Sequence, residues 1–133
     1  AGEAVGDGQA MKAVAQLLGA VTLVGTAEAL SLAETLGLDA AETLCALSVS
    51  SAASFMVTDR GPRMVEVLHG TTPNAQSRMD LTVGDIRVAV EIAREAGLAT
   101  PVGAAAEQVL LRAARHQPPD GDDSLVVREV SRD

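Results

Sequence analysis

The sequence predicts an all-α domain, a helical bundle with a long first helix. Residues that favour helices continue from Gln9 to Leu36, with only Gly19 and Gly25 interrupting them. Apart from two histidines, Phe55 is the only aromatic side chain, so the core must be built from Ala, Leu, Val and Met. Such a core suits closely packed helices and disfavours a β-sandwich or barrel. With no two-residue alternation, internal repeat or heptad run, we expect residues 1–133 to form a single helical domain.

The first predicted helix is unusually long for a domain of this size, because a span from Gln9 to Leu36 at about 1.5 Å per residue extends roughly 40 Å. Small residues recur along it, Ala15 with Gly19 and Gly25 with Ala29. At that spacing another helix, from this subunit or a second one, can approach its backbone. Its uncharged stretch is shorter than the about 20 apolar residues of a membrane span, so we expect a buried core helix.

Local signals also mark the elements that follow the first helix. Gly37 is predicted to end it, and Asp39 with Glu42 three residues later makes a capping-box-like start for a second helix over Ala40–Val49. Shorter elements are expected at Phe55–Asp59, which Gly61 and Pro62 end, and at Arg63–Leu68, with a loop over 69–80.

Two longer helices are predicted in the second half of the chain. Thr82, with an aspartate at the third position after it, is typical of a capped start, and Gly97 ends that helix. Thr100 followed by proline predicts the next helix over 101–116, and a last short helix is expected over 122–130. The apolar stripes are Ile86, Ala89, Val90, Ala93 and Ala96 in the first helix, and Val102, Ala105, Val109, Leu110 and Ala113 in the second.

Composition excludes several classes of function. A formal net charge of −8 with no cluster of Lys or Arg opposes a nucleic-acid partner or an anionic membrane surface. Cys45, the only cysteine, is expected to be a small core residue in a reducing, cytoplasmic compartment. His69 and His116 lack Cys or His neighbours at ligand spacing, so we expect no metal site. Ser50 and Ser51 suggest a polar junction between helices, one able to line a cleft.

Lys12 is the main candidate for chemistry, because it is the only lysine and lies near the start of the most apolar helix. Gln16 follows four residues later on the same face. Partial desolvation beside Met11, Val14 and Ala15 would make the amine usable for proton transfer near neutrality. The other interpretation is a helix-end lysine whose stem lies on the protein while its amine reaches water.

The glycines before Lys12 do not make a dinucleotide-binding loop. Gly6, Asp7 and Gly8 begin such a fingerprint, but Met11 stands where the third glycine should fall and no apolar strand precedes them. We interpret residues 1–8 as a flexible linker. Because the chain begins without methionine, we expect a fragment or an excised domain.

A set of short motifs occurs in order along the chain: Gly6-Asp7-Gly8-Gln9-Ala10-Met11-Lys12 with Gln16, Thr26-Ala27-Glu28-Ala29-Leu30, Gly37-Leu38-Asp39, Ser50-Ser51, Gly84-Asp85-Ile86, Gly97, Pro101 and Asp123-Ser124. Together they resemble the C-terminal domain of the β-hydroxyacid dehydrogenases, the family of 3-hydroxyisobutyrate dehydrogenase and tartronate semialdehyde reductase. The resemblance runs over essentially the whole chain and implies the helical fold of the C-terminal domain of 6-phosphogluconate dehydrogenase-like proteins.

The resemblance also implies a function. In that family an N-terminal Rossmann domain binds NAD or NADP, and the helical domain supplies a lysine that is a general acid or base during hydride transfer on a small hydroxyacid. Lys12 matches that lysine, Gln16 matches a substrate-binding residue, and Asp85 matches a residue near the cofactor. The resemblance further implies a homodimer, and a missing Rossmann domain before the linker at 1–8 that binds most of the cofactor. The isolated chain is then expected to be inactive.

Several positions depart from the family pattern, among them Asp80, which stands where an apolar residue is common. Ala15, Ser77 and Gly84 stand where the family usually has asparagine, phenylalanine and lysine. Asp85 is itself open to a second interpretation, as a residue of the helix start. These departures leave two alternatives open: a non-catalytic helical module for dimerisation or small-molecule binding, and an imine-reducing relative of similar build.

Overall fold

The computed structural model describes residues 6–131 and is a bundle of helices, with no strand among the described residues. The all-α class and the long first helix are therefore confirmed. The elements are α1 (Asp7–Thr35), α2 (Ala40–Ser48), α3 (Phe55–Asp59), α4 (Gly61–Leu68), α5 (Met79–Glu95), α6 (Pro101–His116), the 3₁₀ helix η1 (Asp123–Leu125) and α7 (Val126–Val130).

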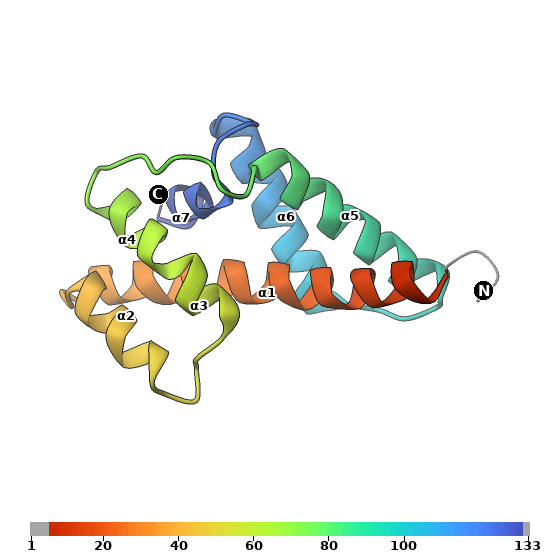
Figure 1. Ribbon diagram of the computed structural model, residues 1–133, viewed down its shortest axis with the longest axis horizontal. Helices are drawn as coiled ribbons and strands as arrows, with labels where there is room; N and C mark the ends of the chain where they lie inside the picture. The colour runs from red at the N-terminus through yellow and green to blue at the C-terminus, as the bar shows by residue number, and fades with distance from the viewer. Residues whose placement is uncertain (1–5, 132–133) are drawn as a thin grey trace.

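The first helix is the axis of the molecule. Figure 1 shows α1 crossing its full length, with α5 and α6 beside one half and α2, α3 and α4 beside the other. α1 contacts all of these helices and α7. By length and composition it could cross a membrane, but the core helix of a soluble protein passes the same test. Its packing against six other helices is what a core helix requires.

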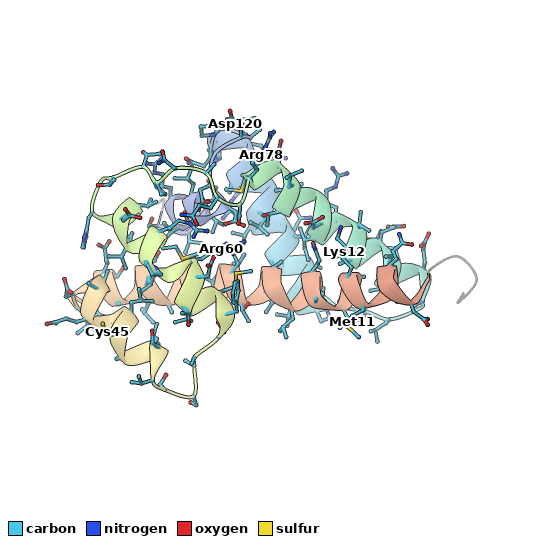
Figure 2. All side chains as sticks on the ribbon, viewed as in Figure 1. Met11, Lys12, Cys45, Arg60, Arg78 and Asp120 are labelled. Atoms are coloured by element: carbon cyan, nitrogen blue, oxygen red, sulfur yellow. The ribbon has the colours of Figure 1, made fainter. Side chains whose placement is uncertain are left out.

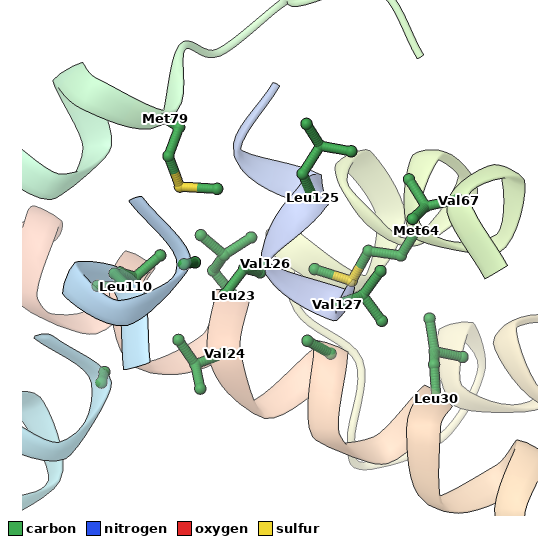
Figure 3. Close-up of a cluster of buried hydrophobic side chains, with 14 of the residues drawn as sticks. Leu23, Val24, Leu30, Met64, Val67, Met79, Leu110, Leu125, Val126 and Val127 are labelled. Carbon is green, nitrogen blue, oxygen red and sulfur yellow. The ribbon is translucent and has the colours of Figure 1, made fainter. Parts of the chain in front are cut away.

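The core is aliphatic, as the composition predicts. Figure 3 shows Leu23 of α1 at its centre against Val126, with Leu110 of α6 and Met64 of α4 around them. All four side chains are fully buried. Phe55 contributes nothing to this core, since it is 69% exposed.

Two helix ends form as the local signals predict. Gly37 and Gly97 have φ angles of 81° and 79°, in the left-handed region that favours glycine, just after α1 and α5. The side chain of Asp39 accepts a hydrogen bond of 2.9 Å from the backbone N–H of Glu42. These ends depend only on nearby residues, which is why the sequence locates them.

The start of α5 differs from the prediction. The helix begins at Met79, so Thr82 and Asp85 lie inside it, and the interpretation of Asp85 as a helix-start residue is wrong. The backbone N–H groups of Met79 and the next residue donate to carbonyl oxygens in segment 119–121, at 2.8 and 3.0 Å. A distant segment thus accepts the hydrogen bonds of backbone N–H groups in the first turn of α5. The Thr82 hydroxyl donates to Asp123 instead of capping the helix.

The buried side of α6 is also rotated from the predicted stripe. Val102 and Ala105 are exposed, whereas the buried residues include Gly103 and Ala106. A Cβ atom on Gly103 would collide with the side chain of Leu17 in α1. The glycine therefore leaves the space that the Leu17 side chain fills between the two helices, which is why the buried side of α6 includes a residue without an apolar side chain.

Two smaller expectations also change. Cys45 is exposed rather than part of the core, because α2 turns its half-buried Leu44 and Leu47 inward and Cys45 outward. α1 starts at Asp7, so the last two residues of the predicted linker belong to its first turn. The first five residues of that linker lie outside the described part of the chain.

A buried ion pair joins α4 to the C-terminal segment. Arg63 donates through Nε to Oδ2 of Asp122 at 2.9 Å, and both side chains are buried. Oδ1 of Asp122 accepts the backbone N–H groups of Gln76 and Ser77 at 2.9 and 3.0 Å. Burial raises the pKa of Asp122, but the hydrogen bonds from Ser124, Arg63 and these N–H groups outweigh it and lower the pKa from 3.8 to about 2.

The orientation of α1 predicts a contrast between two leucines. Leu23→Ala should lower the free energy of unfolding by about 2–5 kcal/mol, because Leu23 is fully buried and its loss leaves a cavity. Leu18→Ala on the same helix should change it by less than about 0.5 kcal/mol, since Leu18 is 63% exposed. Urea unfolding of both variants measures this, and equal losses would contradict the described orientation of α1.

The buried carboxylate predicts a loss of stability in acid. Because the folded-state pKa of Asp122, about 2, lies below its ordinary 3.8, its ionised form stabilises the fold above about pH 4. This contribution, about 2 kcal/mol, should fall by about half at pH 3 and vanish below the folded-state pKa. Urea unfolding between pH 6 and pH 3 measures the loss.

Two variants isolate the contribution of this carboxylate. Asp122→Asn should be less stable at pH 6, because it removes the buried charged partner of Arg63 and leaves only the partly exposed Asp59 at 3.5 Å, and should lose less stability on acidification. The exposed Asp120→Asn is the control and should keep the original pH dependence. If Asp122→Asn loses as much stability as the unchanged chain between pH 6 and pH 3, Asp122 is not the responsible group.

Candidate functional site

The structure brings together the three site residues that the sequence suggests. Lys12 and Gln16 of α1 and Asp85 of α5 line one cavity of about 140 Å³, which we call the outer compartment. Figure 2 shows Lys12 on the side of α1 that faces α5, with Met11 on the opposite side. The remaining lining residues are Gln9, Ala13, Val88 and Ile92.

The polar groups of these three side chains are free to bind a ligand. Lys12 and Gln16 lie one helical turn apart and so share a face of α1. Lys12 is exposed, and Gln16 and Asp85 are half-buried. Among residues 6–131, none of the three side chains has an ion pair or a side-chain hydrogen bond. An amine, an amide and a carboxylate are therefore available to a ligand in the same small cavity.

A second cavity, of about 200 Å³, lies next to the first. It shares Gln16 and Asp85 with the outer compartment and adds Arg60, Thr82 and Asp123 as polar walls. We call it the inner compartment. Its apolar walls are Ala15, Gly19, Ala20, Leu23 and Met56.

An ion pair forms the polar wall of the inner compartment. Arg60 donates through Nε and Nη2 to the two carboxylate oxygens of Asp123 at 2.9 and 3.1 Å, and through Nη1 to Asp59 at 2.7 Å. Thr82 donates to Asp123 at 2.7 Å. Burial lowers the pKa of the Arg60 guanidinium, but hydrogen bonds and the charges of Asp123 and Asp59 raise it above its ordinary value.

Sequence reasoning missed Arg60 and Asp123 as site residues. One signal was present, because two adjacent aspartates, Asp122 and Asp123, stand just before the apolar run Leu125–Val126–Val127. Buried carboxylates need charged partners, and the nearby helices offer Arg60 and Arg63. The pairing itself joins residues far apart in the chain, so the sequence alone does not specify it.

The departures from the family pattern fall in different places. Ala15 lines the inner compartment. Ser77 lines neither compartment, and its carbonyl oxygen accepts the backbone N–H of Asp123 at 2.7 Å. Gly84 also lies outside both compartments, and a Cβ atom there would meet nothing within 4 Å.

The other candidates from the sequence do not join this site. Ser50 and Ser51 are exposed and line neither compartment. His116 lies against Glu129, with Nδ1 and Oε2 2.8 Å apart. In the described part of the chain, no group of three or more His, Cys, Asp or Glu is placed to hold a metal ion.

Comparisons with known proteins agree with this fold. Residues 6–130 match the family described as NAD-binding of NADP-dependent 3-hydroxyisobutyrate dehydrogenase. L-threonate dehydrogenase of Cupriavidus necator is 30% identical over 127 residues, which are 96% of this chain and 41% of that protein.

Two solved structures have the same arrangement of helices. A 3-hydroxyisobutyrate dehydrogenase of Salmonella typhimurium has a TM-score of 0.82 and 25% identity, over 92% of this chain and 42% of that one. The Mycobacterium tuberculosis 3-hydroxyisobutyrate dehydrogenase has a TM-score of 0.80 and 24% identity, over 94% and 44%.

The chain thus spans less than half the length of each of these relatives. The family match nevertheless covers nearly all of the chain. The order of motifs, the helical fold and this match lead to one conclusion: the chain belongs to the 3-hydroxyisobutyrate dehydrogenase-like family of NAD(P)-dependent β-hydroxyacid dehydrogenases.

Proposed function

We propose that this chain is the C-terminal, substrate-side half of an oxidoreductase that acts on a small hydroxyacid or its aldehyde or keto form, with Lys12 as general acid or base. The observation that carries the proposal is the outer compartment, where Lys12, Gln16 and Asp85 meet without internal partners. An upstream Rossmann domain is part of the proposal, with this chain joined to it before α1.

Lys12 would move one proton at the substrate's hydroxyl oxygen. In oxidation its neutral amine accepts the hydroxyl proton, and in reduction its ammonium returns a proton to the carbonyl oxygen. Gln16, one turn along α1, offers both an N–H donor and a carbonyl acceptor to hold the substrate beside that amine. The bound NAD or NADP would accept a hydride from the carbon that bears this hydroxyl in oxidation, or supply one to the carbonyl carbon in reduction.

Asp85 would face the cofactor side of the outer compartment. This compartment, about 140 Å³, is far smaller than the about 300–1,000 Å³ typical of sites that enclose drug-sized ligands. It fits a small acid and at most the reactive end of a dinucleotide. The rest of the cofactor would then be held by the upstream domain.

Homodimerisation through α1 is a further part of the proposal. Of the two small-residue pairs on this helix, Ala15 and Gly19 line the inner compartment. Gly25 is exposed with nothing within 4 Å of its Cβ position, and with Ala29 it lines a separate apolar groove of about 350 Å³. The second pair therefore offers the closer approach to a helix of another subunit.

Replacement of the candidate acid or base tests the proposal. In the complete protein that contains this chain, Lys12→Ala should lower kcat for a hydroxyacid by at least about tenfold, because general acid–base catalysis typically contributes about 10²–10⁴-fold. Lys12→Arg should be similarly impaired, since arginine keeps the charge but does not release its proton. Steady-state kinetics measure both effects.

The exposed Arg115→Ala is the control and should leave kcat within about twofold. A decrease of less than about tenfold in Lys12→Ala would contradict the catalytic role of Lys12. It would favour the alternative of a non-catalytic helical module. Turnover of cyclic imines but not of hydroxyacids would instead identify an imine-reducing relative.

The isolated chain should bind NADPH weakly. The described start of α1 forms no glycine-rich loop after a strand, the arrangement that holds a pyrophosphate in Rossmann domains. Isothermal titration calorimetry of the isolated chain with NADPH measures this. A dissociation constant below about 1 μM would contradict the assignment of the cofactor to the upstream domain.

A further inference from the structure

Among the residues that the structure describes, one side of α1 is apolar along most of the helix and faces away from the core. The buried Leu23 and Ala27 lie on the other side. Residues at spacings of three and four share one face of a helix, and seven apolar residues do so here. The four large side chains among the two outermost residues at each end are between 59% and 66% exposed. We call this row the exposed stripe, and it consists of Val14, Leu18, Val21, Gly25, Ala29, Leu32 and Leu36.

The centre of the exposed stripe is hollow. Gly25 is exposed, and a Cβ atom there would meet nothing within 4 Å. Together with Val21 and Ala29, one helical turn to either side, it lines one wall of a groove of about 350 Å³, and residues 52–54 line the other. The axes of packed helices lie about 8–10 Å apart, and small side chains at the contact permit the shorter distance. A second helix can therefore cross α1 closely at Gly25, with the larger side chains filling the wider space toward either end.

The exposed stripe has the same pattern when it is read from either end. Apolar residues stand 4, 7 and 11 positions before Gly25 and again 4, 7 and 11 positions after it. Two antiparallel copies of α1, related by a two-fold axis at Gly25, therefore place the members of each pair opposite each other. The pairs are Val21 with Ala29, Leu18 with Leu32, and Val14 with Leu36. The stripe is thus complementary to a second copy of itself.

The distribution of charge favours the antiparallel direction. With a formal net charge of −8, two copies of this chain repel each other over much of their surface, but the exposed stripe contains no charged residue. The exposed Glu28 lies beside the stripe. In the antiparallel register Glu28 faces Thr22 of the second copy, whereas in a parallel register it would face another Glu28. Only the antiparallel register avoids opposing these two like charges.

The size of the exposed stripe requires the groove to be part of the interface. The stripe is about 33 Å long at about 1.5 Å per residue and, with a helix about 10 Å wide, covers about 330 Å² on each copy. A standard interface buries about 800 Å² per partner. The opposite wall of the groove, residues 52–54, extends the contact surface. Val49 and Phe55 on either side of that wall are 89% and 69% exposed and add further apolar area.

The geometry points to an antiparallel dimer in which the exposed stripe of α1 is covered by the same stripe of a second copy, with the two-fold axis at Gly25. This inference rests on the homodimer that is part of the proposed function. It adds the surface, the direction and the register of the contact. It is independent of the chemistry at Lys12, which lies on the side of α1 that faces α5.

Cysteine cross-linking tests the register in the complete protein that contains this chain, with the exposed Cys45 replaced by serine. The double variant Leu18→Cys/Leu32→Cys should give a dimer cross-linked by a short bismaleimide, because position 18 of one copy lies opposite position 32 of the other. Each single variant should give none, since the two copies of one position are about 21 Å apart along the helix axis. Peptide mass spectrometry after cleavage at Glu28, which separates the two positions, identifies the link.

Charged replacements test the same contact without a cross-linker. Leu32→Glu should raise the dissociation constant of the dimer by at least about tenfold, because it buries an unpaired carboxylate on both copies. Addition of Leu18→Lys should restore most of the affinity, since each lysine then faces a glutamate of the other copy. In a parallel dimer the double variant would instead oppose like charges and restore nothing. Analytical ultracentrifugation measures the dissociation constants.

Two controls separate association from folding. Leu81→Glu replaces a leucine that is 62% exposed on α5, outside the exposed stripe, and should leave the dissociation constant unchanged. Circular dichroism of each variant should show unchanged helix content. Leu18 and Leu32 are exposed on a single copy and contribute little to its folding, so their replacement acts on the association of two copies.

Several outcomes would overturn the inference. These are a complete protein that is monomeric at every concentration measured, a dimer without the link between positions 18 and 32, and a cross-link in Leu18→Cys alone. Slow reaction of Leu18→Cys with a maleimide in a monomer would show that another part of the same protein covers the exposed stripe, which also contradicts the dimer.

Turnover of hydroxyacids is measured separately from association. An active monomer would overturn the antiparallel dimer and leave the oxidoreductase function intact. An inactive protein that forms the link between positions 18 and 32 would support the dimer and contradict the oxidoreductase function. The two failures are therefore distinguishable.

Discussion

The burial of Asp122 and Asp123 is the constraint on which the rest of the structure depends. Both carboxylates are fully buried, and each is neutralised by an arginine from an earlier part of the chain, Arg63 and Arg60. Leaving either partner out would strand a buried charge at a cost of about 3–5 kcal/mol. The two ion pairs therefore hold α3 and α4 against the C-terminal segment and fix where that segment runs.

The same pair of aspartates connects stability to the cleft. The segment just before them supplies carbonyl oxygens that accept hydrogen bonds from the first backbone N–H groups of α5, and so helps to determine where α5 begins. Asp85, further along α5, lines the outer compartment. Asp123 also forms a wall of the inner compartment with Arg60. One buried cluster thus holds the helices together and gives the cleft its polar end.

The cleft lies along a helix that is itself part of the core. α1 contributes Leu23 to the buried cluster on the same side that carries Lys12 and Gln16 nearer its start. A rigid, packed helix is a good support for a proton-transfer group, because the side chain's position then varies little. The departure at Ala15 leaves room in the inner compartment where the family usually has asparagine.

By itself the sequence determined the features that depend on neighbouring residues. The helix-ending glycines Gly37 and Gly97, the Asp39 cap and the shared face of Lys12 and Gln16 all follow from spacings of a few residues. The family resemblance added Asp85, but its place opposite Lys12 needed the packing of α5 on α1.

Only the tertiary structure decided the start of α5, the rotation of α6 and the inner compartment. The carbonyl oxygens that accept from the first N–H groups of α5 lie in segment 119–121, and Gly103 of α6 packs against Leu17 of α1. Arg60 forms an ion pair with Asp123, which lies 63 residues later in the chain. Each of these features is fixed by a contact between residues distant in sequence, and such contacts leave no local pattern from which they can be predicted.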